Sequence, residues 1–260
     1  MGADGVMVWV ARAHGSTPRE AGAWMWVGPA RIVGTIGGGQ LEHMAIDAAR
    51  AMLRRGEISA EMDVPLGPAI GQCCGGRVLL RLERASVEEA DARRAAEAAQ
   101  FPQAWIFGAG HVGKALGRAL ALTPVRAALV DQREAELAEA ADCGVALHRA
   151  AIPEALIRSA APGAAFVILT HDHALDFLLA AEALGRADAA YVGMIGSATK
   201  RAQFDRFARA RGVDPAGLTC PIAAPGGDKR PAVIAALAAA EIMRALFPAP
   251  AALRPADAPT

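Results

Sequence analysis

Residues 104–113 read Ala-Trp-Ile-Phe-Gly-Ala-Gly-His-Val-Gly, and this stretch joins a short apolar strand to the start of a helix. Its glycines Gly108, Gly110 and Gly113 have the G-x-G-x-x-G spacing of a phosphate-binding turn. The first glycine permits a tight turn, the second lets a pyrophosphate approach the backbone, and the third lets helix and strand touch. Asp131 ends the next strand. Its position is close to that of the acid that holds a ribose hydroxyl in dinucleotide sites, about 20 residues after the glycine motif. These features predict a dinucleotide-binding type of turn.

The rest of the C-terminal part alternates strands and helices. Such alternation indicates a parallel sheet with helices on its faces. The sequence therefore predicts a Rossmann-like parallel-sheet domain over residues 103–247, followed by a disordered Pro/Ala-rich tail over 248–260. The expected strands are Ala104–Phe107, Ala127–Val130, Ala165–Leu169 and Tyr191–Ile195, and helices are expected from Val112, from Glu134, from Leu175, over Lys200–Arg211 and over Pro231–Phe247.

The N-terminal part has a different pattern, with short alternating strands around one amphipathic helix. It predicts a small α+β domain over residues 1–84, joined by a helical linker over 85–102, so that the whole chain is of the α/β class. The expected strands are Val6–Ala13, Ala23–Val27, Arg31–Ile36, Glu61–Leu66 and Val78–Leu82, and the helix is Gln40–Arg55.

Composition excludes several classes of protein. The 260 residues are 53% hydrophobic with a mean hydropathy of +0.25, which is enough for a sizeable core. Lys+Arg and Asp+Glu number 27 each, and a neutral chain is a poor candidate for binding nucleic acid through phosphates. No basic segment followed by an apolar run opens the chain, and Glu241 and Arg244 interrupt its most apolar stretch, Ala232–Leu246. We therefore expect no secretory signal and no membrane span, and a cytoplasmic location.

A second glycine-rich turn, Gly34–Glu42, precedes the N-terminal helix. Its three consecutive glycines, Gly37, Gly38 and Gly39, would expose backbone amides to an anion such as phosphate. No Lys-Ser/Thr pair follows at the spacing of a P-loop. Two interpretations are open, namely an anion or close-approach site, and a tight turn that needs positive φ.

The segment Leu66–Gly76 contains two adjacent cysteines, Cys73 and Cys74, between Gln72 and two glycines. Neighbouring glycines leave the thiols reachable, and nearby amides can lower a thiol pKa. This suits a soft-metal ligand or a thiol that handles sulfur, whereas the alternative is a pair of small buried side chains. The other two cysteines are expected to be ordinary buried thiols: Cys143 and Cys220.

Histidines follow two of the predicted parallel strands. His111 lies inside the glycine turn, where it can contact an anion held there. His171 and His173 follow a buried strand, at the edge where open α/β sheets bind ligands. They point to opposite sides of an extended backbone, so we expect a ligand-lining or structural role for His171, in a hydrogen-bond network with Asp176, in preference to a metal site.

Taken together, these segments resemble the XdhC/CoxI family, and its XdhC branch in particular. The doubled-cysteine and triple-glycine loops in combination are specific to this family, and matching blocks run through nearly the whole chain. The blocks are Gly15–Arg19, Gly34–Glu42, Gly71–Gly76, Phe107–Gly113, Val130–Arg133, Thr170–Asp176, Tyr191–Ser197 and Cys220–Ile222. Ala198 departs from the family pattern, which carries Arg there, and Lys200, Arg201 or Lys229 would have to substitute for it in any phosphate contact.

The resemblance implies an accessory chaperone with no catalytic activity of its own. Such a protein binds molybdenum cofactor as cargo, supports its sulfuration with a cysteine desulfurase, and delivers it to a xanthine dehydrogenase-type apo-enzyme. Homodimers are expected. The family's cofactor-binding cysteines map to Cys73 and Cys74, with Cys73 favoured as the contact to molybdenum through the cofactor. Gln72 would donate to the cofactor's oxo group or pterin.

Two alternatives use the C-terminal domain. The first is an NAD(P)-dependent oxidoreductase that uses residues 108–113 and Asp131, but no catalytic acid–base group stands out to support it, so we do not expect NAD(P) as a cofactor. The second is a protein that binds the nucleotide form of the molybdenum cofactor in this domain.

Overall fold

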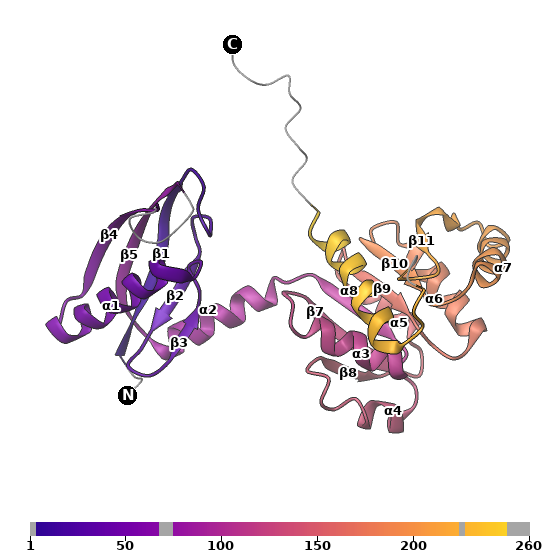
Figure 1. The fold of residues 1–260 in the computed structure, drawn as a ribbon. Coiled ribbons are helices and arrows are strands. Elements are labelled where there is room, and N and C mark those ends of the chain that lie inside the picture. The colour runs from indigo at the N-terminus through magenta and orange to yellow at the C-terminus, as the bar shows by residue number, and fades with distance from the viewer. Residues whose placement is uncertain (1–3, 68–74, 224–226, 249–260) are drawn as a thin grey trace, which may run out of the picture. The chain divides into compact units, whose positions relative to one another are not determined.

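The structure, a computed structural model, describes residues 4–67, 75–223 and 227–248 (Figure 1). The chain folds into two compact units, Met1–Ala99 and Gln100–Thr260. Each unit has its own hydrophobic core. Gln72, Cys73 and Cys74 lie outside the described residues, as does most of the predicted tail.

The first unit contains one antiparallel sheet of five strands in the order β3-β2-β1-β5-β4. Alternate residues of β1 face opposite sides, so Val6, Val8 and Val10 pack under α1 while Met7 packs on the other face. The elements are β1 Asp4–His14, β2 Trp24–Val27, β3 Ile32–Gly34, α1 Gly39–Arg55, β4 Ser59–Pro65, β5 Arg77–Ser86 and α2 Val87–Ala99.

The helix α2 corrects one expectation. We expected residues 85–102 to form a linker, whereas α2 packs on the face of the sheet opposite α1 and belongs to the first unit. Ala90 is fully buried there among Met7 and the two tryptophans of β2. The Arg93 guanidinium lies 4.1 Å from the ring centroid of Trp9. The polar, Ala-rich sequence suggested a connecting helix, but the small Ala90 side chain lets α2 approach the aromatic side chains closely.

The second unit confirms the predicted Rossmann-like sheet. Its six strands pair in parallel in the order β11-β10-β9-β6-β7-β8. This is the doubly wound order, which reverses direction between β6 and β9. The elements are β6 Gln103–Phe107, α3 His111–Leu120, β7 Arg126–Asp131, α4 Glu134–Ala138, β8 Ala146–Arg149, α5 Glu154–Ser159, β9 Ala165–Ile168, α6 His173–Gly185, β10 Tyr191–Met194, α7 Ala198–Arg209, the 3₁₀ turn Pro215–Gly217, β11 Leu218–Thr219 and α8 Pro231–Leu246.

Helices cover both faces of this sheet, as Figure 1 shows. One face packs against α3 and α8, with Leu116 and Ile242 fully buried. The other packs against α5, α6 and α7, with Leu179 and Phe204 fully buried. Among the described residues, no helix has both the length and the apolar character needed to cross a bilayer.

A charge placed under α2 tests whether this helix is part of the first unit. We expect Ala90→Asp to lower the free energy of unfolding of that unit by about 2–4 kcal/mol, because it buries an unpaired carboxylate. Ala92→Asp places the same side chain on the exposed face of α2 and should cost no more than about 0.5 kcal/mol. Urea unfolding followed by the fluorescence of Trp9, Trp24 and Trp26 measures both. Equal losses of stability in the two variants would contradict the packing of α2 on the sheet.

Candidate functional site

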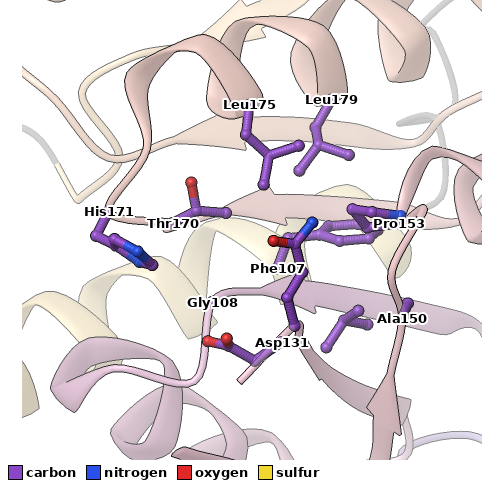
Figure 2. A pocket seen from close by; sticks show the side chains of 11 residues that line it. Phe107, Gly108, Asp131, Ala150, Pro153, Thr170, His171, Leu175 and Leu179 are labelled. Atoms are coloured by element: carbon purple, nitrogen blue, oxygen red, sulfur yellow. The ribbon is translucent and has the colours of Figure 1, made fainter. Parts of the chain in front are cut away.

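The carboxyl ends of the six parallel strands meet at one edge of the second sheet. A pocket lies there at the point where the strand order reverses, the usual ligand position in such sheets. Figure 2 shows Leu175 and Leu179 of α6 entering this pocket from one side and the polar groups of Asp131 and His171 at another. The pocket is lined by Phe107, Gly108, Val130, Asp131, Gln132, Ala150, Pro153, Thr170, His171, Leu175 and Leu179.

The three glycines of the turn after β6 have different tasks. Gly108 has φ +115°, and a Cβ on it would lie 2.5 Å from the Leu169 carbonyl oxygen. A Cβ on Gly113 would lie 1.9 Å from the Gly108 carbonyl oxygen. Both positions therefore require glycine to fold. A Cβ on Gly110 would meet nothing within 4 Å, so its missing side chain leaves open space in front of the turn. Gly110 precedes the first turn of α3, which has no side-chain cap.

Asp131 holds this turn in place. Its Oδ2 atom accepts hydrogen bonds from the Ala109 amide at 2.8 Å and from Arg133 Nη2 at 2.9 Å. Its Oδ1 atom accepts from the Arg133 amide at 2.9 Å and from Arg133 Nε at 3.0 Å. Burial raises the pKa of the carboxyl, but these bonds from Arg133 and Ala109 outweigh it and lower the pKa to about 2. The ribose contact stays a prediction, and it would have to displace a protein donor.

The loop after β9 carries a buried polar network. Asp176 is fully buried, and its Oδ1 atom accepts from the Thr170 hydroxyl at 2.6 Å and from the Thr170 amide at 3.1 Å. Its Oδ2 atom accepts from Lys200 Nζ at 2.5 Å. The expected partner of Asp176 was His171, so the network has other members than the sequence suggested. Both His171 and His173 are exposed, and His111 is exposed at the start of α3.

Lys200 is the residue at this edge that sequence reasoning missed as a candidate site residue. It was named only as one substitute among three for the family's Arg. Arg201 is engaged elsewhere, with Asp205 and with the carbonyl oxygens of Pro215 and Leu218. Within the described ranges, no three His, Cys, Asp or Glu side chains come together as a metal-binding group.

In the first unit, two of the glycine-rich blocks converge on a third, the turn Gly15–Arg19 that follows β1. A Cβ on Gly37 would lie 2.5 Å from Pro18 Cβ, and a Cβ on Gly76 would lie 2.4 Å from the Ser16 carbonyl oxygen. The Leu66 amide donates to the Gly76 carbonyl at 2.8 Å. The described base of the doubled-cysteine segment therefore lies against the same turn as Gly37.

The triple-glycine turn needs residues with positive φ, and at Gly37 it also packs closely against Pro18. Gly37, Gly38 and Gly39 have φ values of +126°, +75° and +65°. Helix α1 starts here without a side-chain cap. The Thr35 hydroxyl accepts from the Gly37 amide at 3.2 Å and lies 3.2 Å from Glu42 Oε2. Because Glu42 places a carboxylate in the first turn, binding of an anion at this helix start stays a prediction.

Of the two described cysteines, Cys143 is buried as expected, in the core against α3. Cys220 was also expected to be buried but is half-buried after β11. Burial raises the pKa of both thiols, so they stay protonated at neutral pH.

The fold and these sites define an α/β protein with a Rossmann-type second unit and a glycine-rich first unit. Two family models match the chain: the XdhC Rossmann domain over residues 104–242, more than half of its length, and the XdhC and CoxI family over residues 1–62. The chain belongs to the XdhC/CoxI family. A crystal structure of a xanthine dehydrogenase from Bacillus halodurans has a similar fold, with a TM-score of 0.78 at 16% identity, over 97% of this chain and 94% of that one. A search of curated proteins gave no match.

Alanine substitutions should distinguish a glycine of the turn after β6 that the fold requires from one that it does not. We expect Gly113→Ala to destabilise the second unit by at least about 3 kcal/mol, because the new methyl group meets a backbone carbonyl that cannot move away. Gly110→Ala should change stability by less than about 1 kcal/mol, since its φ of −70° suits alanine. Urea unfolding followed by circular dichroism measures both, and similar losses would contradict the assignment.

The Asp131 carboxyl should make stability depend on acid. Its pKa in the folded protein, about 2, lies below the ordinary value of 3.8. The stability that the ionised carboxylate contributes is therefore fully present above pH 3.8 and is lost as the pH falls towards 2. Asp131→Asn should cost about 1–3 kcal/mol at pH 7, and this cost should shrink between about pH 4 and pH 2. Asp142→Asn, in an exposed ion pair, is the control and should cost no more than about 1 kcal/mol. If the loss of stability in Asp131→Asn does not change with pH, the lowered pKa of Asp131 is contradicted.

Proposed function

We propose that this chain is an accessory protein in the maturation of a xanthine dehydrogenase-type molybdenum hydroxylase. It holds molybdenum cofactor as cargo, supports its sulfuration by a cysteine desulfurase, and delivers it to the apo-enzyme. The observation that carries the proposal is the convergence of family blocks in the first unit, where the base of the doubled-cysteine segment meets the turn that also contacts Gly37.

The chemistry of the cargo suits these residues. Molybdopterin carries a sulfur-rich, soft metal centre, which thiolates such as those of Cys73 and Cys74 can ligate or contact. It also carries a phosphate, for which glycine-rich turns provide exposed amides. The xanthine dehydrogenase from Bacillus halodurans, which has a similar fold, is consistent with an association with that class of enzyme.

The geometry favours this proposal over an NAD(P)-dependent oxidoreductase. Every acceptor direction of the Asp131 carboxylate is engaged by Ala109 or Arg133, so it is poorly placed to hold a ribose. With a pKa of about 2, it also cannot donate a proton at neutral pH. We therefore propose that the chain is not itself an enzyme. From the family resemblance we also propose that it acts as a homodimer, and from the sequence that its location is cytoplasmic.

Cofactor retention tests the role of the thiols. Protein purified from a host that makes molybdenum cofactor is assayed for molybdenum by mass spectrometry and for pterin by fluorescence after oxidation. The Cys73→Ala, Cys74→Ala double variant should retain at least about tenfold less of both, which corresponds to about 1.4 kcal/mol. Cys73→Ala alone should account for most of the loss, because Cys73 is the proposed contact to molybdenum.

The matched control is the Cys143→Ala, Cys220→Ala double variant, which removes two thiols that lie outside the proposed site. It should retain the cofactor at the wild-type ratio. Retention at that ratio by the Cys73, Cys74 double variant would overturn the thiol role. Tight binding of NADPH by the cofactor-free protein, together with NADPH-dependent reduction of a substrate, would overturn the accessory role.

A further inference from the structure

A second pocket lies at the same edge of the Rossmann-type sheet, beside the pocket of Figure 2. The loop after β9 and the start of α6 line it with Thr170, His171 and His173. The loop after β10 and the start of α7 line it with Gly196, Ser197 and Lys200. All the ionisable side chains that line this pocket are therefore basic.

Lys200 is the unusual member of this lining. Its side chain is only 8% exposed, and its ammonium group donates to Asp176. A Cβ on Gly196 would lie 2.9 Å from Lys200 Cδ, so the glycine leaves room for the lysine stem. An ammonium group has three N–H donors, and among the described residues Asp176 is the single acceptor for them. Because Lys200 lines the pocket, a group bound there can accept from its remaining donors.

The carboxylate of Asp176 balances the charge of the Lys200 ammonium group, so the pocket offers an anion hydrogen-bond donors rather than a net positive charge. Its Oδ1 atom is engaged by Thr170 and its Oδ2 atom by Lys200, and the residue is fully buried behind the lining. Asp176 thus orients the ammonium group. Helix α7 also starts here without an acidic residue in its first turn.

We propose that this pocket binds a tetrahedral oxyanion of the phosphate class. Lys200 on α7, His171 on the loop after β9 and His173 at the start of α6 provide donors from separate elements, which suits a group with several acceptor oxygens. Thr170 and His171 line both pockets, so the group is either free phosphate or the phosphate of an ester that extends towards the Gly108 turn. This inference does not depend on the proposed function, because it concerns a different unit from the doubled cysteines.

The test is a titration of the full-length, cofactor-free protein with inorganic phosphate and, separately, with AMP at constant ionic strength. Ring C–H signals of the histidines are followed by NMR spectroscopy. We expect saturable shifts of the His171 and His173 signals, with those of His43 and His14 unmoved. At least tenfold tighter binding of AMP identifies an ester as the ligand, and equal affinities identify free phosphate.

Variants then assign the donors. The exposed pair His171→Gln, His173→Gln should weaken phosphate binding at least about tenfold, or about 1.4 kcal/mol, whereas His43→Gln should not. The Lys200→Gln, Asp176→Asn double variant keeps a side-chain hydrogen bond but removes both charges, and it should also weaken binding at least tenfold. The control is Lys114→Gln, which changes an ion-paired lysine outside both pockets. Shifts that do not saturate, or equal losses in His43→Gln, would overturn the proposal even if the Lys200 variant fails to fold.

Discussion

The hydrogen bond from the Ala109 amide to the Asp131 carboxylate is the contact on which the carboxyl edge of the second sheet depends. It joins the turn after β6 to the end of β7, and the Gly108 amide reinforces the link by donating to the Val130 carbonyl. The same turn lies so close to Leu169, after β9, that Gly108 has no room for a side chain. Three strand ends are thereby fixed together beside the pocket.

This arrangement explains how a dinucleotide fingerprint can persist in a protein proposed to lack redox activity. In a dinucleotide site the acid at the end of the second strand would hold the ribose. Here Arg133, two residues further along, engages the same carboxylate through its amide and its guanidinium. The motif thus shapes the turn, while Gly110 and the uncapped start of α3 remain open to an anion. The fold alone does not specify the ligand.

Hydrophobic periodicity and glycine spacing were enough to predict most strands and helices, the parallel sheet and the separate roles of Gly108 and Gly113. They failed for β8 and β11, because an exposed edge strand and a two-residue strand have too little pattern. They also missed the place of α2, which rests on one buried alanine against distant aromatic residues. The pairing of Lys200 with Asp176 is a non-local contact that no spacing encodes. The doubled cysteines lie outside the described residues and remain a prediction.

The two buried acids at the sheet edge have a common consequence. Asp131 directs its oxygens to Ala109 and Arg133, and Asp176 directs its oxygens to Thr170 and Lys200. In each case the protein satisfies the acceptors and leaves donors available at this edge, namely the uncapped amides at the start of α3 and, in the second pocket, the ammonium and imidazole groups. An edge that presents donors and retains its acceptors suits an anionic ligand.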